Sequence, residues 1–201
     1  MDDSELNFQK VYDDYHAKIY RYLKHMVGDG EAEDLTQEVF VKIGQALETF
    51  RGESQLSTWI YKIATNAALD RFRSSSPGND KKLVLEDISE THENKNIWTD
   101  EQEASTEQRV IRQEMNDCIR GIIETLPDSY RSVIVLSELE GLKDSEIAEI
   151  TGTSLQATKI RIHRARARLK SELTKACVFY RDEQNRFACD RKNALIVLDE
   201  T

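Results

Sequence analysis

Hydrophobic residues recur every three or four positions through much of the chain, which is the spacing of amphipathic helices. The N-terminal part shows three such stretches, over residues 8–27, 31–47 and 57–73. The last of them is predicted to bury Trp59, Ile60, Ile63, Ala64, Ala67 and Phe72. GDG at 28–30 and SSSPGND at 74–80 contain the residues that commonly end helices.

The periodic pattern is lost over residues 77–108 and returns near Val110. Because a stretch of that length without periodicity is uncommon inside a compact domain, we expect it to join two domains. The predicted fold class is all-α, with two small helical domains connected by a flexible acidic linker. The predicted boundaries are a first domain over 1–76, the linker over 77–108, a second domain over 109–176 and a tail over 177–201.

Amino-acid composition supports a helical protein and indicates that the predicted linker is acidic and solvated. The chain has 201 residues with only 8 Gly and 2 Pro, fewer turn residues than strand-rich folds use. It carries 28 basic and 37 acidic residues, a formal net charge of -9. Residues 77–108 hold 3 basic and 9 acidic residues, which is typical of a solvated, extended segment.

The sequence also indicates where the protein works. No apolar run approaches the roughly 20 residues that cross a bilayer, and the polar, acidic start MDDSELNFQK does not resemble a secretory signal. We therefore expect a cytoplasmic protein with no membrane insertion. Its three cysteines, an odd number, do not indicate a structural disulfide framework there.

Positive charge is concentrated in SLQATKIRIHRARARLK, residues 154–170, which holds six Lys or Arg residues and no acid. A short apolar-periodic stretch at 144–150 and a TGTS turn at 151–154 precede it. A short helix, a turn containing Gly and a longer helix form the helix-turn-helix pattern. A solvated helix face is the other interpretation of the charges, but their single sign favours binding to nucleic acid.

Helical geometry separates two faces of this basic helix. At about 100° per residue, one narrow stripe is predicted to be buried, and its members are Leu155, Thr158, Ile162, Ala165 and Leu169. The opposite face and its flanks carry the candidate DNA contacts Gln156, Lys159, Ile160, Arg161, His163 and Arg164. Arg166, Arg168 and Lys170 lie further along the helix, where they could reach phosphates.

Ile160 lies opposite the predicted buried stripe, where a bulky apolar side chain gains nothing from folding. Two interpretations stay open. The side chain could contact the methyl group of thymine, or it could be one of the exposed isoleucines that protein surfaces commonly carry.

Residues 126–170, LPDSYRSVIVLSELEGLKDSEIAEITGTSLQATKIRIHRARARLK, resemble region 4 of the extracytoplasmic-function sigma factors of the sigma-70 family. Residues 31–73, EAEDLTQEVFVKIGQALETFRGESQLSTWIYKIATNAALDRFR, resemble region 2 of the same family. The resemblance implies a transcription initiation factor without enzymatic activity. It implies that the chain binds core RNA polymerase, through the β′ clamp helices and the β flap, directs it to promoters, and helps to open the DNA.

The resemblance also implies roles for particular residues. The face toward the β′ coiled coil would comprise Asp34, Gln37, Glu38 and Lys42, which fall on the polar side of the second helix. Contacts to the −10 element would come from Ala46, Phe50, Ile63, Asn66, Arg71 and Arg73. Contacts to the −35 element map onto Lys159, Ile160, His163 and Arg164, on the face that helical geometry selects. The sequence departs from the family at 158, where an aliphatic residue is commoner, and at 160, where a small polar one is.

Partners and regulation follow from the same resemblance. Besides core polymerase and promoter DNA, we expect an anti-sigma factor as a partner and stress-response genes as targets. The acidic linker would thread polymerase channels that normally hold nucleic acid, so its acids could imitate a phosphate chain or simply keep it soluble. An enzyme with a nucleic-acid substrate is a further alternative, but the sequence has no phosphate-binding Gly loop, no HExxH and no nucleophile with an evident base. No cofactor is expected.

The tail holds two of the three cysteines, Cys177 and Cys189, within a segment predicted to form a small hairpin around residues 183–185. Three interpretations are open: a zinc site, for which the spacing is a poor match; a redox pair; or two small apolar residues in a packed tail. For the whole chain, the alternative function is a free-standing helix-turn-helix regulator, which would bind DNA as a dimer without polymerase.

Overall fold

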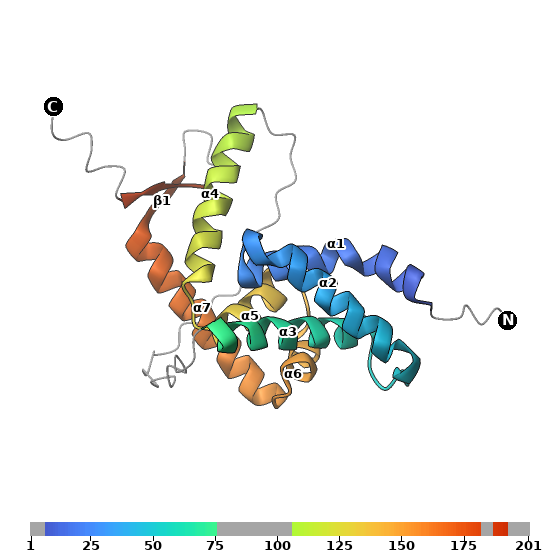
Figure 1. Cartoon of the computed structure of the whole chain (residues 1–201). Helices are drawn as coiled ribbons and strands as arrows, with labels where there is room; N and C mark the ends of the chain where they lie inside the picture. Colours follow the sequence, from blue (N-terminus) through green and yellow to red (C-terminus); the bar gives the residue numbers. More distant parts are fainter. Residues whose placement is uncertain (1–6, 76–105, 182–186, 193–201) are drawn as a thin grey trace, which may run out of the picture. The chain divides into compact units, whose positions relative to one another are not determined.

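The computed structural model describes residues 7–75, 106–181 and 187–192 (Figure 1). Apart from one two-stranded hairpin, the regular structure in these ranges is helical, which confirms the predicted fold class. Residues 77–105 of the predicted linker lie outside the described residues, and its last three residues, 106–108, begin helix α4 (Thr106–Glu124). The described residues fall into two compact units, the first containing 7–75 and 126–166, and the second containing 106–125, 167–181 and 187–192. The predicted domain boundaries stay predictions.

Helix α1 spans Phe8–Val27, as the hydrophobic spacing predicted. The side chain of Asn7 caps it by accepting a hydrogen bond from the backbone N–H of Lys10 at 2.9 Å. It ends at Gly28, whose φ of +87° is a conformation that glycine adopts without steric cost. Helix α2, Asp29–Ala46, follows directly and begins two residues earlier than expected. Asp29 and Glu31 lie in its first turn, where acids stabilise the helix dipole.

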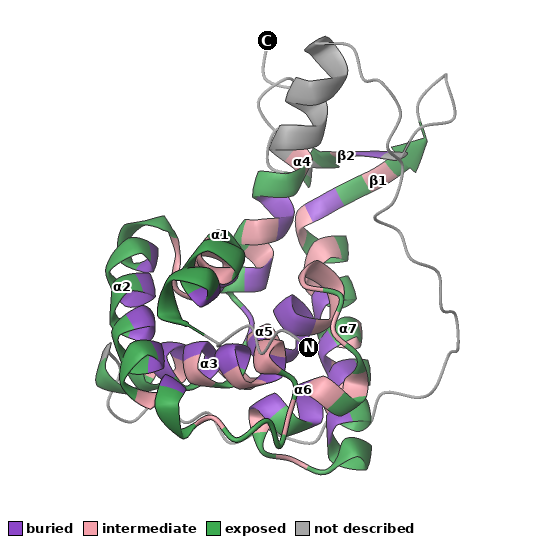
Figure 2. Cartoon of the chain, turned by 90° about the vertical axis from the view of Figure 1, so that its right-hand side faces the viewer, coloured by how far each residue is buried: buried purple, intermediate pink, exposed green. Residues whose placement is uncertain are grey.

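A short 3-10 turn, η1 (Leu47–Thr49), and a loop lead into α3, Leu56–Ser75. Helices α1, α2 and α3 each bury one side (Figure 2). The core that they share includes Ile19, Leu23, Met26, Leu35, Val39, Ile43, Ile60 and Ala64. The prediction for α3 was correct for Ile60, Ala64 and Ala67 and wrong for Trp59, Ile63 and Phe72, which are only half-buried. Two polar residues of the same helix, Thr58 and Thr65, are buried instead.

The rest of the first unit contains α5 (Asp128–Ile134), the π-helical stretch η2 (Val135–Leu139), α6 (Asp144–Thr151) and the first half of α7 (Leu155–Ala176). The sequence predicted a single helix over 130–139. The backbone N–H of Glu140 bonds to the carbonyl of Val135 at 3.0 Å, five residues back, which is the hydrogen-bond spacing of a π-helix.

In the second unit, α4 (Thr106–Glu124) and the end of α7 accompany an antiparallel hairpin of β1 (Cys177–Arg181) and β2 (Phe187–Arg191). The register pairs Cys177 with Arg191 and Phe179 with Cys189. The predicted turn at 183–185 lies outside the described residues. The buried residues of this unit include Cys118, Ile119, Ile123 and Cys177.

Candidate functional site

The turn between α6 and α7 sets the direction of the predicted DNA-reading helix. Gly152, with a φ of +65°, ends α6 and lets the backbone N–H of Thr153 bond to the carbonyl of Ala148 at 3.0 Å. The Thr153 hydroxyl hydrogen-bonds to that of Thr158 on α7 at 2.7 Å. Thr158 is completely buried. Its hydroxyl therefore ties the first turns of α7 to the loop, a contact that an aliphatic side chain could not make.

The predicted stripe of α7 is buried except at its first residue. Thr158, Ile162, Ala165 and Leu169 are buried, whereas Leu155 is 45% exposed, so the prediction was wrong for Leu155. Because Leu155 is the first residue of α7, the chain before it is a turn, and helical periodicity alone cannot tell whether a neighbour covers that position.

The opposite face of α7 is open to solvent. Ile160 is 46% exposed, which places it outside the core as the geometry of the helix predicted. The other candidate DNA contacts are exposed or half-buried, and they comprise Gln156, Lys159, Arg161, His163, Arg164 and Arg168. The site is thus a continuous helical face with one large apolar residue among polar ones.

The arginines of α7 differ in how they are held. Arg166 pairs with Glu138 at 2.7 Å, and Arg168 pairs with Glu172 at 3.0 Å. Lys159, Arg161 and Arg164 form no ion pair within the described ranges. The cations near the start of α7 are therefore the ones that could meet phosphates without first giving up a partner.

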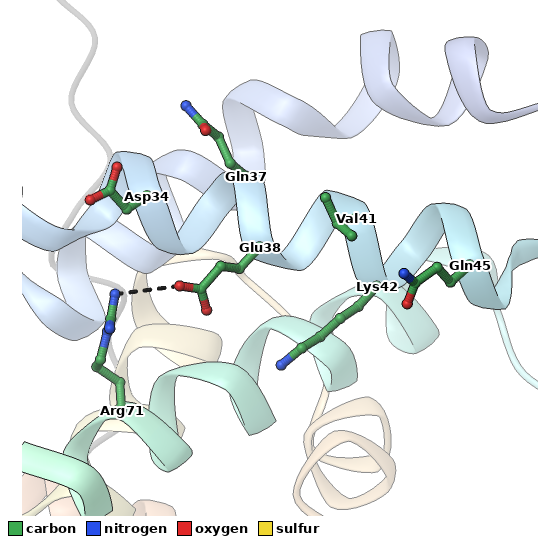
Figure 3. A pocket seen from close by; sticks show the side chains of 7 residues that line it. All are labelled: Asp34, Gln37, Glu38, Val41, Lys42, Gln45 and Arg71. Carbon is green, nitrogen blue, oxygen red and sulfur yellow. Dashed lines mark ion pairs between the residues drawn. The ribbon is translucent and has the colours of Figure 1, made fainter.

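A second polar face lies on α2. Asp34, Gln37, Glu38 and Lys42 are all exposed, and they line a shallow hollow together with Val41, Gln45 and Arg71 (Figure 3). In Figure 3, Glu38 and Lys42 extend from α2 on the side of α3. Val41 is 59% exposed, so the hollow combines opposite charges with one uncovered apolar side chain.

Arg71 reaches this hollow from α3. Its guanidinium pairs with Glu31 at 3.0 Å. It also pairs with Glu38 at 3.6 Å, the ion pair drawn in Figure 3. Arg73, predicted with it as a DNA contact, pairs with Asp70 at 2.8 Å on the same helix. In this structure both arginines are thus engaged by carboxylates, and a phosphate would have to compete with those partners.

The remaining residues predicted for the −10 element come from two places. Ala46 and Phe50 flank η1, while Ile63 and Asn66 lie on α3, and all four are at least partly accessible. The Phe50 ring contacts Trp59, with 5.1 Å between ring centroids. Half-buried Trp59 was assigned to the core by its spacing, so the sequence did not single out this aromatic pair beside the loop.

The buried carboxylate of Glu140 was not predicted from the sequence. Its side chain is 2% exposed and accepts hydrogen bonds from the Tyr61 hydroxyl at 2.6 Å and from Arg21 at 3.0 Å. Burial, followed by the hydrogen bond to Glu140, raises the pKa of Tyr61 far above its usual range. The same carboxylate raises the pKa of Arg21. These partners lie 79 and 119 residues from Glu140 in the sequence, so no local pattern reveals them.

Arg131 makes a second unpredicted set of contacts in the first unit. It donates a hydrogen bond to the carbonyl of Met26 at 2.7 Å and lies over the ring of Phe72, 4.8 Å from the ring centroid. Together with Glu140, it connects residues 7–75 to residues 126–166 through polar groups.

Metal and membrane chemistry receive no support from the described residues. In these ranges no group of three His, Cys, Asp or Glu side chains is arranged to hold a metal ion. Nor does any helix in them combine the length and apolar composition that crossing a bilayer requires.

Comparison with family models finds two regions. The model of Sigma-70 region 2 matches residues 11–77, and the model of Sigma-70, region 4 matches residues 116–169. The two matches contain all the candidate contacts in α2, α3 and α7, including Asp34, Asn66 and Arg164.

Among curated proteins, the chain is 34% identical over 167 residues to the ECF RNA polymerase sigma factor SigW of Bacillus subtilis, covering 83% of this chain and 88% of that protein. It is 30% identical over 173 residues to the RNA polymerase sigma factor SigZ of the same organism, covering 86% and 90%. An ECF RNA polymerase sigma-E factor of Haemophilus influenzae is 32% identical over 161 residues, covering 79% and 83%.

Solved structures show the same fold. The structure of the sigma factor RpoE with the anti-sigma factor NepR from Bartonella quintana matches with a TM-score of 0.59 at 20% identity, covering 83% of this chain and 96% of that chain. The structure of CnrH in complex with the cytosolic domain of CnrY matches with a TM-score of 0.57 at 22% identity, covering 83% and 87%.

Proposed function

The chain belongs to the extracytoplasmic-function sigma factors of the sigma-70 family, and we propose that its exposed faces on α7 and α2 carry promoter recognition and polymerase binding, respectively. As a member of that family it is a non-enzymatic RNA polymerase sigma factor that directs transcription initiation. This assignment is preferred to a free-standing helix-turn-helix regulator because both regions of the family are matched in one chain.

For the −35 element, α7 would enter the major groove with its N-terminal half. Gln156, Lys159 and Arg164 supply amide and cationic groups that suit base edges and phosphates. Ile160 would rest against a thymine methyl group, because its exposed apolar side chain has that surface to offer. Because Arg166 and Arg168 are held in ion pairs, the base contacts would come from the preceding turns of α7.

For the −10 element, the loop after η1 and the adjoining part of α3 would receive an unstacked base. Leaving the stack costs a few kcal/mol, which stacking and edge hydrogen bonds in a protein site offset. Phe50 and Trp59 provide rings, and exposed Asn66 provides both a donor and an acceptor. Ala46 and Ile63 would form apolar walls, and Arg71 and Arg73 would contact phosphate after leaving their carboxylate partners.

For core polymerase, the hollow on α2 would meet the β′ clamp helices, while residues of region 4 would meet the β flap. Glu38 and Lys42 present opposite charges beside exposed Val41, and such mixed surfaces set register and association rate in protein complexes.

We further propose that an anti-sigma factor restrains this chain in the cytoplasm and that its promoters belong to stress-response genes. The first part is supported by one of the structural relatives, which is a sigma factor solved in complex with an anti-sigma factor. Both depend on the family assignment rather than on a feature of the described residues.

The observation that carries the proposed reading face is the solvent-open side of α7, with Lys159 and Arg164 lacking ion pairs within the described ranges. The test is promoter-dependent run-off transcription with core polymerase and the variants Lys159→Ala and Arg164→Ala. Each should lower initiation roughly 10- to 100-fold, the loss that removing a base or phosphate contact produces. The matched control is Lys175→Ala, an exposed cation at the far end of α7 that pairs with Glu172, and it should initiate like the unaltered chain. If Lys159→Ala and Arg164→Ala also do so, α7 does not read the promoter by this face.

A further inference from the structure

The three cysteines of the chain gather in the second unit, although the sequence placed only two of them near each other. The Sγ atoms of Cys118 on α4 and Cys177 on β1 lie 3.1 Å apart, and both residues are buried, at 5% and 2% exposure. In the register of the hairpin, Cys189 pairs with Phe179, two residues along the strand from Cys177. Residues two apart share a face of a strand, so Cys177 and Cys189 point the same way.

The surroundings make the three thiols chemically different. Burial, together with hydrogen bonds and charge from the Cys118 and Cys189 thiols, raises the pKa of Cys177 to about 12. Because the thiolate is the reactive form, Cys177 reacts slowly with an external oxidant. Cys189 is half-buried and so more accessible than the other two.

We propose that Cys118 and Cys177 form a reversible disulfide in response to a peroxide, with Cys189 as the thiol at which oxidation enters. No disulfide joins the three cysteines in this structure. A disulfide between α4 and β1 would close a chain separation of 59 residues and would link the tail to a helix that lies partly within the family's region 4.

The chemistry balances in three steps. The Cys189 thiolate attacks one peroxide oxygen, the O–O bond breaks, and the products are a Cys189 sulfenic acid and water, or an alcohol from an organic peroxide. The Cys177 sulfur then attacks the Cys189 sulfur, and the S–O bond breaks with loss of water. Finally the Cys118 thiolate attacks the Cys177 sulfur and releases the Cys189 thiolate. In sum, two thiols lose two electrons and two protons, and hydrogen peroxide becomes two waters.

The 3.1 Å sulfur contact is the reason to expect Cys118–Cys177 as the final product. A disulfide requires the sulfurs to approach to about 2.05 Å, so about 1 Å of movement is enough. Cys177 and Cys189 are diagonal rather than directly opposite in the hairpin, and the backbones of diagonal neighbours stand about 7–8 Å apart, farther than an unstrained disulfide spans even when the thiols meet. Their disulfide is therefore the transient one.

The test uses the full chain, and trypsin separates the three cysteines. Cleavage after Lys and Arg places Cys118 in QEMNDCIR, Cys177 in ACVFYR and Cys189 in FACDR. After treatment with hydrogen peroxide and blocking of remaining thiols, mass spectrometry should find QEMNDCIR joined to ACVFYR, with FACDR blocked. Dithiothreitol should reverse the link. A dominant ACVFYR–FACDR link, links only between molecules, or no loss of thiols would overturn the proposal.

Two variants separate the roles of the thiols. Cys189→Ser should slow peroxide oxidation at least tenfold while still giving the Cys118–Cys177 link, and an unchanged rate would remove Cys189 from the entry role. Cys118→Ala should abolish the final link and leave a Cys177–Cys189 disulfide that dithiothreitol reduces. If Cys118→Ala gives no link between ACVFYR and FACDR after peroxide treatment, Cys177 does not react with oxidised Cys189 and the proposed order of steps is wrong. If a substitution at a buried cysteine impairs folding, peptide mapping of the unaltered chain still shows whether Cys118 and Cys177 form the disulfide.

Discussion

At the scale of single residues, the first unit depends on a few buried polar groups that find partners far away in the sequence. Glu140 accepts hydrogen bonds from the Tyr61 hydroxyl and from Arg21, and the Tyr22 hydroxyl lies 2.8 Å from the Thr65 hydroxyl. Thr65 donates its one hydroxyl hydrogen to the carbonyl of Tyr61 at 2.7 Å, so Tyr22 must donate to Thr65. Each group would leave an unsatisfied partner behind if it were removed.

Replacing Glu140 with Ala should therefore destabilise the chain. The buried Tyr61 hydroxyl would lose its acceptor, and we expect the free energy of unfolding to fall by about 2 kcal/mol. Urea denaturation followed by circular dichroism measures this change. Glu149→Ala is the matched control because Glu149 is exposed on α6, and its effect should stay within about 0.5 kcal/mol. Equal effects of the two substitutions would show that Glu140 contributes nothing by its burial.

Tyr22 should make the free energy of unfolding decrease as the pH rises above about 10. Burial raises the pKa of its hydroxyl far above 10.0, so the folded chain holds a proton that the unfolded chain releases near pH 10. The contribution is complete below that pH and declines as pH rises toward the folded pKa. Between pH 9 and 11 the loss from this one group should be about 1 kcal/mol. Tyr22→Phe should remove that part of the decline in urea denaturation, and an unchanged decline would contradict the assignment.

At the scale of elements, the turn before α7 fixes how the reading helix begins. Gly152 has a positive φ, a conformation that costs an ordinary residue about 1 kcal/mol. The hydroxyls of Thr153 and Thr158 then join the turn to α7. The start of α7 is thus held by backbone conformation and hydrogen bonds rather than by Leu155, which is exposed.

Gly152→Ala should lower the free energy of unfolding by about 1 kcal/mol because of this conformation. Gly30→Ala makes the opposite prediction and serves as its control. Gly30 is the second residue of α2 and has nothing near its missing Cβ, so alanine, the better helix former, should stabilise the chain slightly, by up to about 0.5 kcal/mol. Thermal or urea denaturation of both variants checks the pair. A stabilising Gly152→Ala would contradict the described turn.

The elements also show how far the sequence could predict the structure. Local periodicity correctly predicted α1 and the buried side of α7 after its first turn, because one face of a helix meets the core along its whole length. It could not predict the π-helical stretch at 135–139, because that stretch differs from an α-helix in the spacing of its backbone hydrogen bonds rather than in composition.

The candidate site was predictable to the extent that it lies on helix faces. The exposed set on α7 and the polar side of α2 follow from spacing, and the resemblance to the family supplied their roles. Contacts between residues distant in the sequence could not be predicted from spacing. Cys118 contacts Cys177, which is 59 residues away, and Arg71 of α3 forms an ion pair with Glu38 of α2. Pairing of this kind depends on packing between elements, about which a single sequence gives no direct information.

At the scale of the whole molecule, charge governs how the chain meets DNA. The net charge is -9, while the cations of α7 form a short positive segment. Few phosphates can be neutralised, and the remaining field repels DNA. This chain should therefore bind promoters tightly only when it is part of a complex with the polymerase.

We expect the isolated chain to bind promoter DNA with a Kd weaker than about 1 μM at physiological salt. With core polymerase the same promoter should be bound at least about 100-fold more tightly, because the polymerase adds its own contacts. Fluorescence anisotropy with a labelled promoter fragment measures both values. Nanomolar, sequence-specific binding by the isolated chain would contradict the expectation and favour a free-standing regulator.

The most direct measurement combines the purified chain with bacterial core polymerase that lacks its own specificity subunit. The mixture is analysed by gel filtration, and the start sites of RNA made on a library of promoter fragments are then mapped. We predict that the chain elutes with the polymerase and that RNA begins at defined positions preceded by shared −10 and −35 sequences. If the chain elutes separately and no promoter-dependent RNA is made, it does not act as a sigma factor.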